Sequence, residues 1–417
     1  MKLTLQLGII SALNILFIFL FQWYVFTQLG PGIETDALFA GMTVPQLALA
    51  IISGSLMHVL VPLLAGESEE RLRSDAWGFL VLIGGLFLLV SIVLIILAPW
   101  WVPVTVPGFD ETGQALTVEL TRIQLIGMVF TAISGVQLAT YHAQQQFVWA
   151  ELASFLASAV AFLLLIWALP RYGVLAAAWL STVRMVLQTL LLTPGMGMPV
   201  RPNFRSAVIR QAWSRIKPLL LGSAYYKTDP LIDRFLLSMA TSGSLSLYYL
   251  AQQIYGAANQ VLNKAIAAPL VPLLSQQHKA EDKSGFEHSF HQRLLYVGVI
   301  SLVSLIILAL FGQTMLESFV GYGNVGSQDI ANLWWTMIWL GGMFIGGAMG
   351  QITSSSFYAI GDTSTPTRIG IYTYTFYIPI KIALFYYFGV KGVALATSAF
   401  LIVNFLLQNY YIKKKYF

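Results

Sequence analysis

Ionisable residues inside long apolar stretches carry the clearest chemistry in this sequence. One apolar stretch, residues 218–240, holds two carboxylates and two cations within a short run. A charged group inside a hydrocarbon environment is costly and is a functional candidate by default. Carboxylates there can hold a cation, and lysine binds phosphate as a point charge. The ionisable residues within apolar stretches include Arg184, Lys227, Asp229, Asp233, Arg234, Lys264 and Lys381.

Spacing divides the charges of residues 218–240 between two faces of a helix. Asp229 and Asp233 are four residues apart and share one face, whereas Lys227 and Arg234 share another. Pro230 lacks an N–H group and is predicted to kink the helix between them, at a place suited to a hinge. The alternative is that these charges pair with one another to fix helix packing. Asp233 and Arg234 are expected near the outer interface, where their side chains can snorkel.

The composition places all of these residues in a membrane protein. The chain has 417 residues, of which 57% are apolar and only 10% are charged, and its mean hydropathy is +0.73. Soluble chains carry about 25% charged residues. Soluble enzymes, nucleic-acid binders and disordered scaffolds are therefore excluded, and the net charge of +5 is no sign of nucleic-acid binding. The absence of cysteine excludes disulfides, thiolate chemistry and cysteine-bound metals.

The apolar stretches predict an all-α polytopic fold with 12 transmembrane helices. A helix needs about 20 apolar residues to cross the hydrocarbon core. Continuous apolar runs exclude a β-barrel, whose strands alternate. We expect the first stretch to be a retained helix, because it is too long for a signal peptide and no cleavage site follows it. The predicted spans are 5–27, 37–64, 76–99, 120–143, 147–169, 172–193, 218–240, 244–274, 294–313, 331–358, 367–388 and 391–411.

Basic residues predict the orientation of these spans. Cytoplasmic segments carry an excess of lysine and arginine. If the N-terminus is inside, the outer segments hold only Arg122, Arg171 and Lys391. Both termini are therefore predicted to be cytoplasmic. The inner segments hold Lys2, Arg71, Arg73, Arg201, Arg205, Arg210, Arg215, Lys217, Lys279, Lys283, Arg293, Arg368 and Lys413 to Lys415.

Repeated segments indicate a duplication. Val61-Pro62-Leu63-Leu64 recurs as Val271-Pro272-Leu273-Leu274, Tyr141 is echoed by Tyr358, and Tyr172-Gly173-Val174 is echoed by Lys391-Gly392-Val393-Ala394. Six spans per half give a parallel repeat about an axis along the membrane normal. We expect six-helix lobes at 1–194 and 218–417. The join, 195–217, is predicted to be a basic amphipathic linker on anionic lipid headgroups, with docking of a partner as the alternative.

Four stretches of the sequence carry a family resemblance: LGPGIETDALFAGMTVPQ (29–46), APWWVPVTVPGF (98–109), DPLIDRFLLSMATSGSLSLYYLAQQI (229–254) and FYAIGDTSTPTRIGIY (357–372). They resemble the MurJ/MviN family of the multidrug/oligosaccharidyl-lipid/polysaccharide exporter superfamily, which includes the MATE transporters. The resemblance implies two lobes that open alternately to either side of the bacterial cytoplasmic membrane. It also implies export of an undecaprenyl-pyrophosphate-linked saccharide, which is lipid II in the best-known members.

Departures from the family pattern concern the substrate. Lipid II flippases of this family typically have 14 spans, and the final pair is missing here. The family lines its cavity with arginines, but the matching positions read Ile15, Phe21 and Leu49, and an Asp-Arg pair reads Gln252-Gln253. Asp36 matches the acidic residue with which the second helix begins in the family. The resemblance then leaves Lys227, Lys264 and Arg184 to bind a pyrophosphate, and Gln252, Gln253 and Asn259 to bond sugar hydroxyls, with interhelical bonding as the alternative.

Lys381 has a separate interpretation. In some family members a sodium ion lies between the seventh and eleventh helices, held partly by a carboxylate. The resemblance therefore implies that Lys381, tethered to Asp229 or Asp233, replaces the bound cation and that coupling to sodium is lost. A plain structural ion pair is the alternative.

The leading functional prediction is a flippase that moves a lipid-linked saccharide from the inner to the outer leaflet. A cation-coupled exporter of small amphipathic molecules is the alternative. A membrane enzyme is disfavoured, because the outer loops are short and the two longest hold only three and two acidic residues. We find no ATP site and expect no cofactor, metal or nucleic-acid partner, with transport coupled to the membrane potential or to a cation. We also expect a monomer.

Overall fold

The computed structural model describes residues 2–65, 68–200, 202, 204, 208–212 and 225–416, and within these ranges it contains helices and no strands. The chain divides into two compact units, Met1–Gly243 and Ser244–Phe417. This division leaves residues 225–243 in the first unit, whereas the predicted lobes are 1–194 and 218–417. The boundaries of those lobes stay a prediction.

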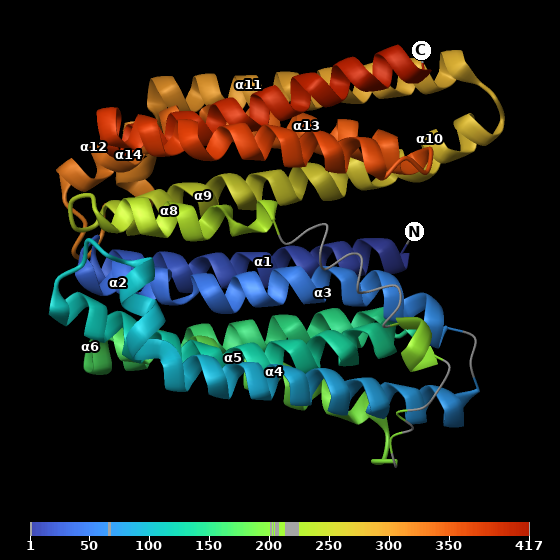
Figure 1. The fold of residues 1–417 in the computed structure, drawn as a ribbon, viewed down its shortest axis with the longest axis horizontal. Helices are drawn as coiled ribbons and strands as arrows, with labels where there is room; N and C mark the ends of the chain where they lie inside the picture. The colour runs from blue at the N-terminus through green and yellow to red at the C-terminus, as the bar shows by residue number, and fades with distance from the viewer. Residues whose placement is uncertain are drawn as a thin grey trace. The chain divides into compact units, whose positions relative to one another are not determined.

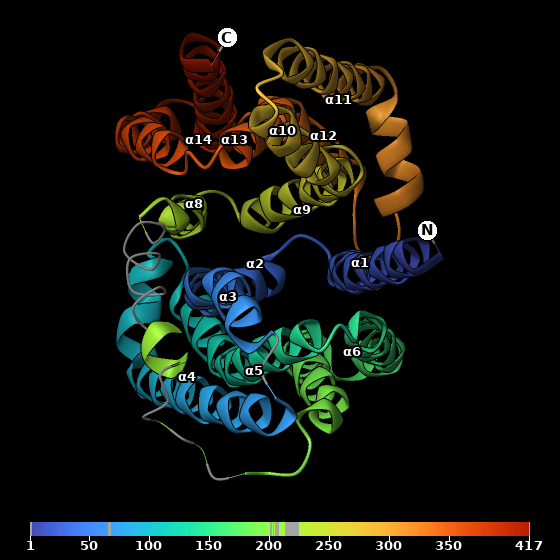
Figure 2. The same cartoon turned by 90° about the vertical axis from the view of Figure 1, so that its right-hand side faces the viewer.

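The first unit is a bundle of helices centred on α5. This helix packs against α2, α3, α4 and α6, as the end-on view in Figure 2 shows. Leu60, Phe87, Leu125 and Met128 form part of its apolar core. The elements are α1 (Lys2–Leu29), α2 (Ile33–Gly41), α3 (Thr43–Leu64), α4 (Glu69–Thr105), α5 (Glu111–Ala143), α6 (Phe147–Leu192), η1 (Thr193–Met196), η2 (Tyr226–Thr228) and α8 (Asp229–Ser238).

The second unit has the same kind of architecture, with α13 at its centre. This helix packs against α9, α10, α11 and α14, and the long helices of the unit run side by side in Figure 1. Phe290, Ile352 and Phe357 are fully buried in its core. The elements are α9 (Ser244–Leu262), the π-helical turn η3 (Asn263–Ala267), α10 (Ala268–Lys279), α11 (Lys283–Val320), α12 (Ser327–Trp339), α13 (Gly341–Ala359) and α14 (Ser364–Tyr416).

Backbone geometry repeats between the two units. Helix α6 bends at Gly173, with φ 57° and ψ −146°, and α14 bends at Gly389, with φ 58° and ψ −136°. Only glycine adopts this region without strain, so both kinks depend on it. The structure therefore pairs Gly173 with Gly389, and the predicted pairing with Gly392 is wrong by three residues. Gly392 was paired with Gly173 because the residues around the two glycines are similar, but the non-helical backbone conformation of Gly173 occurs at Gly389.

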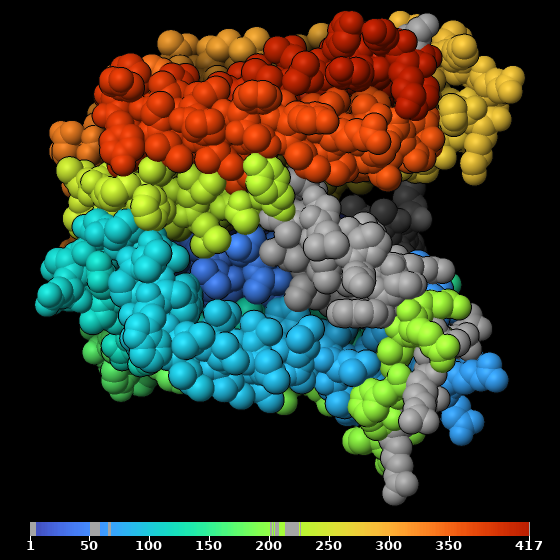
Figure 3. Space-filling view, viewed as in Figure 1, coloured from blue at the N-terminus to red at the C-terminus, as the bar shows by residue number. Residues whose placement is uncertain are grey.

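Several helices have the length and surface of membrane spans. Among the described residues, six helices are long and apolar enough to cross a bilayer. Helices α6 and α14 each cover two predicted spans. The count of twelve crossings stays a prediction. Figure 3 shows α4 on the visible face of the first unit. A run of its apolar side chains is exposed, as expected of a lipid-facing surface: Val81, Leu82, Leu86, Leu88, Leu89, Ile92, Val93, Ile96, Leu97 and Trp100.

Much of the predicted linker, including Arg205 and Arg215, lies outside the described residues. Residues 208–212 are helical. Val208, Ile209 and Ala212 pack against the apolar core of the first unit, whereas Arg210 is exposed. This turn therefore has one apolar face against the protein and one charged face directed outward.

Asp362 ties the turn between α13 and α14 to the end of the chain. Its carboxylate accepts hydrogen bonds from the backbone N–H and hydroxyl of Thr365 and pairs with Lys415 at 2.8 Å. Burial alone would raise the pKa of Asp362, but the bonds from Lys415, Thr365 and Ser364 outweigh it and hold the pKa well below its ordinary value of 3.8.

We expect this tie to weaken in acid. A carboxyl group whose pKa is lowered by folding stabilises the folded state above its unfolded pKa, and this contribution is lost as the pH falls through the folded value. Thermal unfolding should show a larger loss of stability below about pH 4 in the wild type than in Asp362→Asn. Parallel pH profiles for the two proteins would contradict the assignment.

Candidate functional site

The charges near residue 230 lie at the start of α8. Pro230 occupies the first turn of α8, after the 3₁₀ turn η2. A proline costs nothing there, since the first N–H groups of a helix have no internal partner. The predicted kink within a continuous helix is therefore not what the described residues show. Lys227 is half-buried, and its Nζ donates to the carbonyl of Ala50 on α3.

Asp233 and Arg234 are both buried, with 1% and 4% of their surface exposed. The interpretation in which they snorkel toward the headgroups is therefore wrong. Arg234 Nε donates to Thr43 Oγ1 at the start of α3, at 3.1 Å. Asp229, one turn earlier, is half-buried. The two carboxylates thus differ in their access to solvent, which spacing alone does not indicate.

Asp36 holds the chain that follows α8. Its side chain is 1% exposed, and its Oδ2 accepts from the N–H of Gly243 at 2.7 Å. Gly243 has φ +87° and lies against Pro31. Nearby, the N–H of Gly108 donates to Ser238 Oγ at 3.3 Å. Asp36, which the sequence predicts as a binding residue, is therefore buried and already bonded within the first unit.

Replacing Asp36 by alanine should destabilise the first unit. A hydrogen bond to a charged group contributes about 1.5–3 kcal/mol, and the Gly243 N–H would lose its partner. We expect a lower midpoint of thermal unfolding for Asp36→Ala in detergent. Glu34→Ala is the matched control, because Glu34 is exposed on the same helix. Equal midpoints for the two variants would show that the bond is dispensable.

Arg184 lines a small pocket inside the first unit. The pocket has a volume of about 40 Å³ and lies among α1, α2, the turn between α2 and α3, and α6, with Gln22 and Ser181 as polar neighbours. A water molecule needs about 10–15 Å³ of such volume. In this conformation the pocket accepts water and excludes a saccharide, so a headgroup could meet Arg184 through this pocket only if the surrounding helices moved.

The predicted binding residues of the second unit lie on α9 and η3. Gln252 and Gln253 are half-buried, and Lys264 is exposed in the π-helical turn. Asn259 lines a pocket of about 170 Å³. Tyr255, on the same helix, is buried; it donates to the carbonyl of Met337 at 2.7 Å and stacks on Phe344. On α9, Tyr255 is therefore used in contacts within the unit, whereas the amides of Gln252 and Gln253 remain partly accessible.

Lys381 is fully buried in the second unit. Its Nζ lies 4.8 Å from the centre of the Tyr377 ring. The hydroxyls of Tyr377 and Tyr248 lie 2.9 and 3.0 Å from Thr397 Oγ1, which itself donates to the carbonyl of Val393. The tyrosines therefore donate to Thr397. The predicted bridge from Lys381 to Asp229 or Asp233 would join the two units and stays a prediction.

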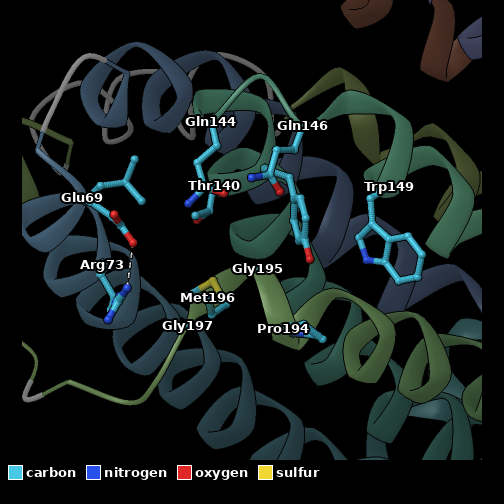
Figure 4. Close-up of a pocket in the computed structure, with 12 residues that line it drawn as sticks. Glu69, Arg73, Thr140, Gln144, Gln146, Trp149, Pro194, Gly195, Met196 and Gly197 are labelled. Atoms are coloured by element: carbon cyan, nitrogen blue, oxygen red, sulfur yellow. Dashed lines mark hydrogen bonds and ion pairs between the residues drawn. The ribbon is translucent and has the colours of Figure 1, made fainter.

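A larger pocket lies at the end of the first unit that is predicted to be cytoplasmic. It has a volume of about 510 Å³ and is lined by α4, the α5–α6 turn and η1. Figure 4 shows the Glu69–Arg73 ion pair on one side and Trp149 on the other. None of the predicted site residues lines it. Residue types gave no signal, because Gly195 becomes a neighbour of Gln144 and Gln146 only through folding.

Within the described residues, no group of three or more histidine, cysteine or acidic side chains is placed to hold a metal ion. The described part of the molecule does place cations and amides at separate points along its helices. Such an arrangement can accommodate a polar headgroup within a membrane.

Comparison with known proteins decides the family. The model of the family "Lipid II flippase MurJ" matches residues 25–417. The chain belongs to the MurJ family. A probable lipid II flippase MurJ of Buchnera aphidicola subsp. Schizaphis graminum is 21% identical over 434 residues, covering 100% of this chain and 84% of that protein. The lipid II flippase MurJ of Burkholderia cenocepacia is 22% identical over 361 residues, covering 82% and 70%.

Solved structures show the same fold. A lipid II flippase MurJ in an inward closed conformation matches with a TM-score of 0.86, 17% identity, and coverage of 98% of this chain and 87% of that chain. An inward-facing MATE multidrug transporter matches with a TM-score of 0.79, 16% identity, and coverage of 96% and 94%. This MurJ-family chain is thus an all-α polytopic protein of the bacterial inner membrane, and its family is one of transporters rather than enzymes.

Proposed function

We propose that this MurJ-family chain flips an undecaprenyl-pyrophosphate-linked saccharide, with lipid II as the first candidate, from the inner to the outer leaflet. The family match across residues 25–417 carries this proposal. Lys227 and Lys264 support it, because both are at least partly exposed on predicted spans and can offer positive charge to a pyrophosphate.

Alternating access is the mechanism we infer. Relatives of the same superfamily adopt an inward-facing form and an outward-facing form, the latter matching this chain with a TM-score of 0.63. In this chain, movement of α8 would have to break the bonds that Asp36 and Thr43 make with Gly243 and Arg234. These contacts therefore hold α8 and the chain that follows it against α2 and the start of α3.

The proposal includes the partners and coupling of transport. We infer that anionic lipids bind the linker, since Arg210 is exposed on a turn whose apolar face packs on the protein. We further propose that the chain acts as a monomer with both termini cytoplasmic. The driving force would be the membrane potential, with Lys381 in place of a coupling sodium ion.

Reconstituted vesicles test the substrate. Fluorescent lipid II and a second undecaprenyl-pyrophosphate-linked saccharide would be placed in separate vesicle batches, and access to an impermeant reagent would report flipping. We expect protein-dependent flipping of at least one of the two lipids.

The second candidate, export of small amphipathic molecules, is favoured by the likeness to the multidrug transporter. It predicts efflux of a fluorescent amphipathic cation from the same vesicles. Efflux of that cation without flipping of either lipid would replace the leading proposal.

A further inference from the structure

A pocket lined by amides lies in the second unit, beside the π-helical turn η3. Its volume is about 170 Å³, and α9, η3, α11 and α13 surround it. The side chains of Asn259, Gln260, Asn263 and Gln351 line it, together with an apolar floor that includes Val297 and Ile352. No charged side chain contributes to this lining.

Asn259 has an unused acceptor in this pocket. Its Oδ1 is buried and has no hydrogen-bond partner among the described residues. Buried polar atoms are normally paired, so each exception needs an explanation. Gln260 and Gln351 are exposed, so the pocket reaches the surface of the unit. A donor brought from outside could therefore reach Asn259.

Backbone shape creates the space. The π-helical turn Asn263–Ala267 interrupts the path from α9 to α10, and such turns are frequent at functional sites. Gly256 and Gly347 both line the pocket. A Cβ on Gly347 would lie 3.1 Å from Asn259 Nδ2, whereas a Cβ on Gly256 would meet no atom within 4 Å. The pocket therefore exists partly because Gly256 and Gly347 have no side chains that would fill it.

The depth of the pocket limits what it can bind. Asn259 stands at the centre of the predicted span 244–274, where exposed amides facing lipid would be costly. Amides offer donors and acceptors without charge, which suits hydroxyl or acetamido groups better than phosphates. The volume suits a single sugar ring rather than a longer glycan.

We propose that this pocket is a subsite for one uncharged sugar ring of the transported headgroup, with Asn259 Oδ1 accepting from a hydroxyl or acetamido N–H. The inference rests on the proposed function and adds to it the part of the substrate that the second unit recognises.

Saturation-transfer NMR on the purified full chain tests this subsite, with N-acetylglucosamine as the probe and inorganic pyrophosphate as the competitor. Asn259→Leu removes the amide, and Gly256→Leu fills the pocket. Gly370→Leu is the matched control, because Gly370 on α14 also has no atom within 4 Å of an added Cβ. We expect binding to wild type and to Gly370→Leu, at least tenfold weaker binding to the other two variants, and no competition by pyrophosphate.

Three results would overturn the subsite: no binding of N-acetylglucosamine to wild type, equal binding to all variants that keep the wild-type unfolding midpoint, or displacement by pyrophosphate. Flipping of lipid II is measured separately on the same protein. Flipping without sugar binding would remove the subsite and leave the proposed function intact. Sugar binding that depends on Asn259, without flipping of any lipid-linked saccharide, would remove the function and leave the subsite.

Discussion

Lys227→Gln and Lys264→Gln should each lower the rate of flipping by about 10- to 100-fold while leaving expression and unfolding midpoints near wild type. A hydrogen bond to a charged group contributes about 1.5–3 kcal/mol, and each 1.4 kcal/mol is a factor of ten. Lys264 is exposed, so its loss leaves no buried group unpaired. Lys227 is half-buried and donates to the Ala50 carbonyl, and glutamine keeps an uncharged donor there on a side chain one bond shorter.

Two matched variants make this prediction specific. Lys279→Gln removes an exposed lysine from the last turn of α10, at the predicted cytoplasmic end, and should flip at the wild-type rate. Lys264→Arg keeps the charge and should retain most activity. Full activity of Lys227→Gln and of Lys264→Gln in the vesicle assay would show that Lys227 and Lys264 do not bind the pyrophosphate.

Transport by the wild type should proceed equally well when sodium is replaced by potassium, and Lys381→Met should abolish most of it. Lys381 is fully buried with its Nζ over the Tyr377 ring, a contact that contributes about 2 kcal/mol when desolvated. If its partner is a carboxylate, as the sequence predicts, removing one member of a buried pair costs about 3–5 kcal/mol. A tethered ammonium would make a mobile cation unnecessary.

The controls for Lys381 separate its charge from its packing. Lys391→Met alters an exposed lysine on the same helix and should leave flipping unchanged. Exchanging the charges in a Lys381→Asp, Asp233→Lys double variant should restore part of the activity that either single variant loses. Wild-type flipping that stops without sodium would contradict the proposal.

Much of this fold follows from sequence pattern. Continuous apolar runs allow only helices, because the backbone must bond internally in lipid, and the predicted spans 120–143 and 147–169 fall within α5 and α6. The duplication was visible in short motifs, and the kinks at Gly173 and Gly389 repeat it in backbone geometry. The register of the last motif was missed. The sequence around Gly392 resembles that around Gly173, whereas the kink at Gly389 is visible only in its φ and ψ angles.

The candidate site could be predicted only in part. Residue type and position in an apolar run name Lys227, Arg184, Asn259 and Lys381 as candidates, and their roles stay predictions. They did not show that Asp36 is already bonded to Gly243, or that Arg234 is buried against Thr43, because those partners are remote in sequence and meet only when α8 packs.

The sequence by itself therefore determined the membrane environment, the helical class, the family and the set of charges within apolar runs, since each depends on composition, periodicity or local motif. The tertiary structure alone decided which polar groups are used and which remain available. Asp36 and Thr397 are occupied by bonds within their own units, whereas Asn259 keeps an unpaired oxygen beside a pocket. The physical reason is that hydrogen bonding and access depend on distances between side chains from different helices, and a residue's own neighbours in the chain do not set those distances.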